Sequence, residues 1–292
     1  MRFGIYPNLG KADLKQALTA LTGLLRLKKI DYSFPLSMRK GLMEMGFTEE
    51  TYETEEIMGQ RDFILSVGGD GSFLGAARTF QNDDVLMAGL HLGDLGFLNS
   101  ITLSDMEKRL DEILSGRYRE EHRLFLAPAI VHGDGHWEEL PHVLNDVVMG
   151  HETIGQLARL RLFINDSFIQ EYAADGLIIS SPTGSTGYSL SCGGPVLGPS
   201  DDRIIIVPIC AHTLQRFAMV LRKDEIVKIR VPEREKNLSL SLDGAYTFSF
   251  TNRETLYVKS VEKPIRFLRF QDQDFFGSIT RKLVRKVADC GK

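Results

Sequence analysis

The spacing of apolar residues changes near residue 121, and this change most constrains the fold. Before it, short apolar runs predict strands at 3–6, 63–67 and 85–90. Apolar residues three or four apart predict a helix at 11–27. Further helices are expected at 72–80 and at 103–114, where Ser115-Gly116 ends the helix. Ser72 is the expected N-cap of the second helix. Strands that alternate with helices predict a parallel α/β sheet covered by helices on both faces.

Beyond residue 121 the chain consists of short β-rich runs with turn sequences between them. The predicted strands are 124–131, 143–149, 157–164, 167–172, 177–180, 204–209, 226–231, 238–242, 246–250, 256–261 and 265–270. This pattern predicts an all-β domain, a sandwich or a barrel. The last stretch, 278–287, is basic and helical, and it is too short to fold alone. The prediction is therefore an α/β domain at 1–120 that is joined by the tail 271–292, and a β-rich domain at 121–270.

Charge and cysteine content limit the partners and the compartment. Lys and Arg number 35 against 39 Asp and Glu, so the net charge is −4. Such a chain has no general attraction for nucleic acid or an anionic membrane, and local geometry or a metal must hold any bound polyanion. Three cysteines without metal-ligand spacing indicate a reducing, cytoplasmic location and no protein metal site. No apolar segment approaches the ~20 residues of a membrane helix.

A glycine-rich turn between a predicted strand and a predicted helix is the sharpest local motif. Gly68, Gly69 and Gly71 leave room for backbone N–H groups to converge on a phosphate, beside the positive end of the following helix. Asp70 would repel that phosphate, so it is expected to accept a proton from a hydroxyl group or to orient Mg²⁺. The alternative is a simple helix-capping turn. The motif is not a Walker A loop, because GxxxxGK[ST] does not occur.

A second motif is a run of small hydroxylated and glycine residues at 175–189, which overlaps a predicted strand and extends beyond its end. It offers hydroxyl groups and exposed backbone to a polar ligand, although a solvated loop would look similar. Three weaker features accompany it. Residues 93–99 form either the edge of a pocket or an ordinary loop, Asn145-Asp146 is either a turn or a buried polar pair with a ligand, and Asp243-Gly244 has the sequence of a hairpin turn. His212 is a further pocket candidate, although a lone His is more often structural.

Together these segments resemble the NAD kinase family, whose members phosphorylate NAD with ATP. The motifs that carry the resemblance are GGDGSFLGAAR at 68–78, GDLGFLNS at 93–100, NDVVMG at 145–150, DGLIISSPTGSTGYSLSCGGPVLGP at 175–199, HTL at 212–214 and LDGA at 242–245. The resemblance implies a phosphofructokinase-like nucleotide core in the α/β domain. It also implies an all-β C-terminal domain that binds NAD and forms oligomers.

The same resemblance assigns roles to individual residues. Asp70 corresponds to the catalytic aspartate, and Asn145 with Asp146 to the Asn-Glu pair that holds NAD. Gly71 and Phe97 would line the NAD site, and Asp243 resembles the family's late aspartate near that site. The positions that match NAD contacts, some of them contributed across a subunit interface, are Asp175, Thr183, Thr186 and Tyr188. Gly68 and Gly69 are the remaining cofactor-binding candidates. The chain departs from the family where Asp146 replaces Glu, Leu98 replaces Tyr, Ala211 replaces Pro and Ala173 replaces Arg.

The function implied is transfer of the γ-phosphoryl group of ATP, with Mg²⁺ or another divalent metal, to the 2′-hydroxyl of the adenosine ribose of NAD. Asp70 would accept the proton of that hydroxyl. The implied partners are NAD, ATP and other copies of the chain in a homodimer or homotetramer. The alternatives are a GGDG-type lipid or sugar kinase and a non-catalytic NAD-binding regulator. A phosphofructokinase-type sugar kinase also needs a Thr-x-Asp segment, which this sequence lacks.

Overall fold

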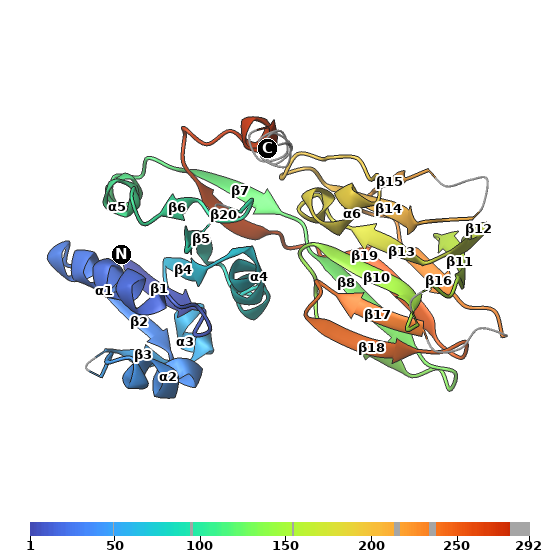
Figure 1. The fold of residues 1–292 in the computed structure, drawn as a ribbon, viewed down its shortest axis with the longest axis horizontal. Coiled ribbons are helices and arrows are strands. Elements are labelled where there is room, and N and C mark those ends of the chain that lie inside the picture. The colour runs from blue at the N-terminus through green and yellow to red at the C-terminus, as the bar shows by residue number, and fades with distance from the viewer. Residues whose placement is uncertain (49, 94–95, 154, 213–216, 234–237, 281–292) are drawn as a thin grey trace, which may run out of the picture. The chain divides into compact units, whose positions relative to one another are not determined.

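The computed structural model describes residues 1–292 except 49, 94–95, 154, 213–216, 234–237 and 281–292. The described chain forms two compact units (Figure 1). The first unit is Met1–His122 together with the chain from Ile265 onward, and the second is Arg123–Pro264. Each unit has its own hydrophobic core and is described separately.

The first unit is an α/β layer structure. Its elements in chain order are β1 (Arg2–Pro7), α1 (Leu14–Leu27), β2 (Asp31–Pro35), the 3-10 helix η1 (Leu36–Met38), α2 (Arg39–Glu44), β3 (Tyr52–Glu53), α3 (Glu55–Met58), β4 (Phe63–Gly68), α4 (Asp70–Thr79), β5 (Leu86–His91), β6 (Ile101–Thr102), α5 (Met106–Leu114), β7 (Arg119–Arg123) and β20 (Ile265–Arg269).

The sheet of this unit has the strand order β3-β2-β1-β4-β5-β20-β7, with β6 paired to β5. The pairs β3-β2, β2-β1, β1-β4, β4-β5 and β5-β20 are parallel, which confirms the predicted parallel sheet. From β1 the chain moves to β2 on one side, and β4 leads to β5 on the other. The order of the strands therefore reverses between β1 and β4, and such a switch point is where open α/β sheets bind ligands.

The three predicted helices of this unit begin at residues other than those predicted. Helix α1 begins at Leu14 rather than at residue 11, because the chain first makes a turn in which the Leu14 N–H donates to Lys11 O (3.2 Å). Helix α4 begins at Asp70, with Gly69 as its N-cap, because the Ser72 hydroxyl accepts a hydrogen bond from Gly69 N (3.2 Å) from inside the first turn. Helix α5 begins at Met106 rather than at 103, after Asp105 accepts hydrogen bonds from Thr102.

Strand β20 is the largest correction to the predicted organisation. The sequence pattern places residues 265–270 in the β-rich domain, but Arg266 and Phe267 pair in parallel with Leu86 and Met87 of β5. Phe267 also packs against Phe73 of α4, with ring centroids 4.7 Å apart. The chain from Ile265 therefore belongs to the first unit. The predicted tail helix 278–287 lies outside the described residues except for 278–280, which are helical.

The second unit is composed almost entirely of strands. Its elements are β8 (Leu126–Val131), β9 (Trp137–Glu139), β10 (Asp146–His151), β11 (Ala158–Ile164), β12 (Ser167–Ala174), β13 (Gly176–Ser180), the 3-10 helix η2 (Gly184–Thr186), α6 (Tyr188–Ser191), β14 (Arg203–Ile209), β15 (Met219–Arg222), β16 (Val227–Arg230), β17 (Leu238–Leu242), β18 (Tyr246–Phe250) and β19 (Thr255–Ser260).

These strands form two six-stranded sheets with the orders β15-β14-β13-β10-β17-β18 and β12-β11-β16-β19-β8-β9. Their pairs are antiparallel, and one core contains side chains of both sheets, so the predicted all-β domain is confirmed as a two-sheet structure. Strand β13 is buried along its whole length, because Ile178 packs on the other face with Leu197, Ile205 and Val207.

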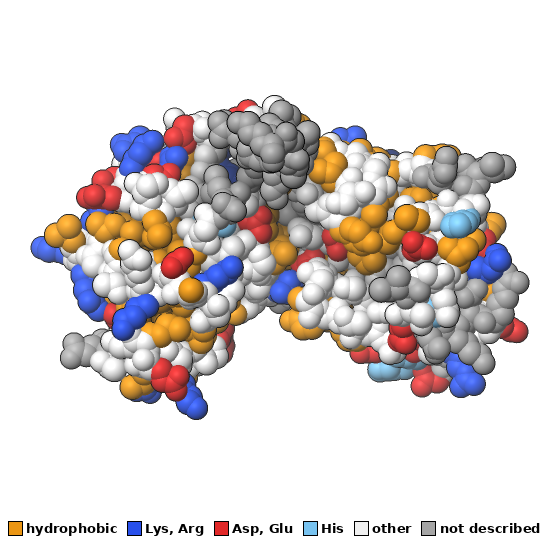
Figure 2. Space-filling view, in the orientation of Figure 1, with side chains coloured by type: hydrophobic (Ala, Val, Ile, Leu, Met, Phe, Trp, Pro, Cys, Tyr) orange, Lys and Arg blue, Asp and Glu red, His pale blue; other side chains and the backbone are white. Residues whose placement is uncertain are grey.

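The surface carries charges of both signs. On the face drawn in Figure 2, the Lys and Arg side chains of the described residues are scattered among Asp and Glu side chains. Within the described parts of the chain, no helix is long and apolar enough to span a membrane.

Candidate functional site

The glycine-rich turn leads directly from β4 into α4, beside the switch point of the sheet. Gly68 has φ +156°, and a Cβ there would lie 2.3 Å from the Ser72 hydroxyl oxygen. At Gly69 and Gly71 an added Cβ would meet no heavy atom within 4 Å, so the space in front of both is open. Asn8, which follows β1, donates to the Ser72 hydroxyl (2.8 Å) and joins the two sides of the switch point. Open backbone at a helix N-terminus suits an anionic ligand.

Asp70 is the first residue of α4, and its carboxylate is held by a loop. The oxygen Oδ2 accepts a hydrogen bond from Phe97 N (2.7 Å), and Oδ1 accepts from Leu98 N (3.2 Å) and Asn99 Nδ2 (2.9 Å). A Cβ on Gly96 would lie 1.9 Å from Oδ1, so only glycine lets the loop approach this closely. The structure therefore brings Asp70 and Phe97 together. It adds Gly96 and Asn99, which lie within the GDLGFLN motif but are not predicted individually from it.

In the second unit, Asp243 holds the backbone that precedes β10. Its Oδ1 accepts from Asn145 N (2.8 Å) and Asp146 N (3.2 Å), and its Oδ2 accepts from Leu144 N (3.1 Å). Asp243 and Gly244 have φ of +50° and +63° and lie in the three-residue turn 243–245 between β17 and β18, in which Ala245 N donates to Leu242 O (2.9 Å). Asp243 is thus both the predicted hairpin residue and a neighbour of the Asn145-Asp146 pair, but its carboxylate binds backbone.

Asp146 is a buried acid beside that carboxylate. The residue is 7% exposed, and among the described residues no hydrogen bond or ion pair reaches its side chain. Burial, and secondly the negative charge of Asp243, raise the pKa of Asp146 to about 7. A buried carboxyl group without hydrogen-bond partners is unfavourable. A ligand that donates hydrogen bonds to it would supply the missing partners.

The hydroxyl-rich run closes around the same pair. The Ser181 hydroxyl donates to Leu144 O, and Ser181 N donates to Asn145 O (2.9 Å). A Cβ on Gly184 would lie 2.2 Å from Asn145 O, so this position also needs glycine. The buried Thr183 hydroxyl accepts from Arg123 Nη1 (3.1 Å), and the Thr186 hydroxyl donates to Thr183 O (3.3 Å). The buried Arg123 is not predicted from the sequence.

Asp175 lies away from Asp146 within this unit. Asp146 pairs with Ser180 at one end of β13, whereas Gly176, next to Asp175, pairs with Gly150 at the other. Four residues of strand separate the two ends, roughly 13 Å. Asp175 is exposed. Tyr188 is also exposed, but it follows Gly187, where an added Cβ would lie 3.9 Å from Asp146 Oδ2. Partial burial, followed by the neighbouring Cys192, raises the pKa of Tyr188.

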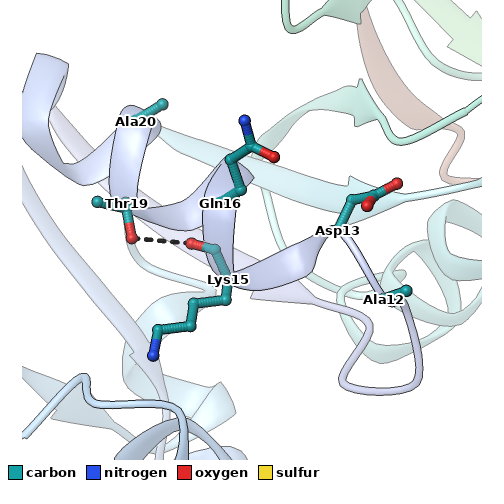
Figure 3. A pocket seen from close by; sticks show the side chains of 6 residues that line it. All are labelled: Ala12, Asp13, Lys15, Gln16, Thr19 and Ala20. Atoms are coloured by element: carbon teal, nitrogen blue, oxygen red, sulfur yellow. Dashed lines mark hydrogen bonds between the residues drawn. The ribbon is translucent and has the colours of Figure 1, made fainter.

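Two surface hollows do not coincide with the predicted residues. One, of about 600 Å³, lies along the first turns of α1 between Ala12 and Ala20 (Figure 3). Within it, the Thr19 hydroxyl donates to Lys15 O (2.8 Å), so this hydroxyl is turned onto its own helix. The other, of about 510 Å³, includes Trp137 and Tyr257 of the second unit. The candidate residues are therefore identified by their hydrogen bonds and burial.

A metal ion held only by protein side chains does not fit this site. Across the described parts of the chain, no three His, Cys, Asp or Glu side chains are grouped so that they could hold an ion. Asp70 is a single carboxylate beside open backbone. This donor set suits a divalent cation that arrives with phosphate ligands of its own.

Comparison with known proteins places both units in one family. The family model for the ATP-NAD kinase N-terminal domain matches residues 13–118, and that for the ATP-NAD kinase C-terminal domain matches 144–270. An NAD kinase from Thermoanaerobacter sp. (strain X514) is 31% identical over 286 residues, which are 98% of this chain and 99% of the relative. An NAD kinase from Moorella thermoacetica is 33% identical over 97% of this chain and 89% of its own length.

Two solved structures share the fold. Yeast NADH kinase complexed with NADH matches with a TM-score of 0.86 and 22% identity, over 97% of this chain and 87% of that one. An NAD kinase from Archaeoglobus fulgidus in complex with ATP matches with a TM-score of 0.73 and 19% identity, over 97% of this chain and 98% of that one.

Proposed function

Because this chain belongs to the ATP-NAD kinase family and is an NAD kinase, we propose that it transfers the γ-phosphoryl group of ATP to the 2′-hydroxyl of the adenosine ribose of NAD. The product is NADP. The observation that carries the proposed chemistry is the Asp70 carboxylate, which is fixed in the first turn of α4 beside open glycine backbone.

Asp70 acts in this proposal as the general base. A carboxylate has about four lone-pair positions, and three hydrogen bonds from the 97–99 loop use three of them. The remaining position can accept the proton of a ribose hydroxyl as it attacks phosphorus. The loop fixes the direction of the carboxylate, and such positioning supplies much of the acceleration in phosphoryl transfer.

The ATP phosphates are assigned to the glycine-rich turn. The open backbone at Gly69 and Gly71 and the N-terminus of α4 offer positive partial charge without a basic side chain. Mg²⁺, or another divalent ion, would accompany ATP and neutralise charge between its phosphates. This arrangement allows a protein with a net charge of −4 to bind polyanions.

NAD is assigned to the second unit. Asn145, Asp146 and Thr183 form one cluster, with Asp146 ready to accept hydrogen bonds from ligand hydroxyl groups. Asp175 and Tyr188 are exposed, and Asp175 lies beyond the opposite end of β13 from Asp146. Because NAD consists of two nucleotides, these separated residues can contact different parts of it, in one subunit or across two.

We also propose a homo-oligomer and a cytoplasmic location. The β12 edge strand exposes Phe168 (57%) and Ile169 (41%), a hydrophobic surface that a second copy would cover. Cys192 and Cys210 are free thiols, as expected in a reducing compartment.

The activity is tested by incubating the purified protein with Mg-ATP and NAD and detecting NADP with an NADP-specific dehydrogenase. Asp70→Asn should lower kcat by about 10²- to 10⁴-fold, the contribution typical of a general base, while NAD still binds. The matched control is Asp111→Asn, which removes a half-exposed carboxylate of α5 that pairs with Lys28. NAD binding without NADP formation by the wild-type protein would favour the regulator, and near-normal kcat in Asp70→Asn would exclude Asp70 as the base.

A further inference from the structure

Arg269 lies at the end of β20, the strand that returns to the first unit. Only 7% of the residue is exposed, in a strand whose Phe267 and Leu268 are also buried. A buried guanidinium is unfavourable unless hydrogen-bond acceptors and an opposite charge surround it. Its partners therefore indicate what the residue does.

Each of the three nitrogen atoms of the Arg269 guanidinium donates a hydrogen bond. Nη1 donates to Leu98 O (2.7 Å), Nη2 donates to Phe97 O (3.2 Å) and Nε donates to Glu121 Oε1 (3.2 Å). Burial lowers the pKa of Arg269, and the adjacent Glu121 opposes that effect. Two of the three contacts thus go to the backbone of the loop that holds Asp70.

The peptide group between Phe97 and Leu98 is bound at both ends. Its carbonyl oxygen accepts from Arg269, and its N–H donates to Asp70 Oδ1 (3.2 Å). A trans peptide group is planar, with N–H and C=O pointing in opposite directions. Fixing the carbonyl therefore fixes the direction of the N–H, and the positive charge on the carbonyl side strengthens the hydrogen bond to the carboxylate.

We propose that Arg269 is a positioning residue for Asp70 and acts through the Phe97–Leu98 peptide group. It does not touch the substrates. It holds the loop so that two amides and the Asn99 side chain aim the carboxylate and leave one acceptor position free. The inference rests on the proposed function, because it takes Asp70 as the base.

The discriminating experiment is a double-mutant cycle on kcat. Arg269→Lys keeps the positive charge but replaces the planar fork by one ammonium group, which cannot hold three fixed acceptors. We expect kcat to fall by about 10- to 100-fold, the effect of a small misplacement of a catalytic group, with KM for ATP and NAD changed by less than about 3-fold. In the Asp70→Asn background the same substitution should lower kcat by less than about 3-fold, because coupled residues are not additive. Detecting the NADP that accumulates over several hours makes these low residual rates measurable.

The matched control is Arg266→Lys on the same strand. Arg266 binds Glu120 and Asp84 and, among the described residues, makes no hydrogen bond with the 97–99 loop. The kcat of the Arg266→Lys enzyme should therefore stay within about 2-fold of the wild-type value. Equal losses from Arg269→Lys in both backgrounds, or an unchanged kcat, would overturn the proposal. If Arg269→Lys does not fold, Glu121→Gln is used in the same cycle, since it leaves the guanidinium in place but weakens its anchor.

Amide hydrogen exchange at Leu98 tests the geometry without activity. The exchange should become at least about 10-fold faster in Arg269→Lys and remain unchanged in Arg266→Lys. An unchanged rate in both variants refutes the proposal. NADP formation by the wild-type protein separately tests the proposed function, so the two failures are distinguishable.

Discussion

Replacing Asp146 with Asn should stabilise the protein by an amount that grows with pH. Burial and Asp243 raise the pKa of Asp146 from 3.8 to about 7 in the folded protein. Between these values the native state keeps a proton that the unfolded state has lost, so the free energy of unfolding falls as pH rises. Asn carries no charge at any pH and removes this dependence.

The magnitude follows from the shift. One pKa unit corresponds to about 1.4 kcal/mol, so a shift of about three units penalises the ionised native state by up to ~4 kcal/mol. The same relation gives ~1.7 kcal/mol at pH 5 and ~4 kcal/mol at pH 8. Screening by solvent reduces these figures little, because Asp146 is only 7% exposed. The change of about 2.5 kcal/mol between the two pH values is the useful quantity, since steric effects of Asn are the same at both.

Urea unfolding at pH 4–8, followed by tryptophan fluorescence, measures this difference. Trp137 is the single tryptophan and lies on β9 of the unit that contains Asp146, against Tyr257. Asp224→Asn is the matched control, because Arg222 lowers the pKa of the exposed Asp224 and the small effect there has the opposite sign. A stability difference between wild type and Asp146→Asn that is flat across this pH range would refute the reasoning.

Two further substitutions test how the pair at 145–146 is held. Asp243→Asn replaces one acceptor oxygen by an amide N–H that faces backbone donors, so it should cost about 1–3 kcal/mol in urea unfolding and raise KM for NAD. It should also reduce the pH-dependent loss of stability, because Asp243 helps to raise the pKa of Asp146. Gly184→Ala places a methyl group 2.2 Å from Asn145 O and should lower NAD affinity at least tenfold by calorimetry, whereas Gly198→Ala, with nothing within 4 Å of its Cβ position, should change it less than twofold.

Much of the architecture was accessible from the sequence because the apolar patterns are local. Of the apolar α1 residues, Leu14, Ala17, Leu18, Leu21 and Leu25 are buried and Leu24 is half-buried. The short β-rich runs after residue 121 form two sheets with one core. The glycine-rich turn and the segment 93–99 follow strands as predicted, whereas Asn145-Asp146, expected inside the strand 143–149, lies where β10 begins. These inferences needed only the period of the pattern and the positions of glycine.

The remaining features depend on contacts between distant segments. Strand β20 resembles the preceding strands, and only its pairing with β5 assigns it to the first unit. Sequence spacing also does not reveal that Asp175 precedes the first residue of β13, whereas Asp146 pairs with its last residue, Ser180. One signal was available: Arg269 stands in the apolar run IRFLRF, and a charge in a buried strand requires a partner.

The two units use the same local device, which explains why the predicted acidic residues differ in role. In each, a carboxylate accepts hydrogen bonds from consecutive backbone amides, Asp70 from 97–98 and Asp243 from 144–146. Gly96 permits the loop to approach the Asp70 carboxylate, whereas Gly184 permits the hydroxyl-rich run to approach Asn145 O. In the proposed reaction, Asp70 keeps an acceptor position for a hydroxyl proton, whereas Asp243 leaves Asp146 as the buried acid that would contact NAD. On this proposal the net charge says little about polyanion binding, because amides rather than basic side chains would set the local field.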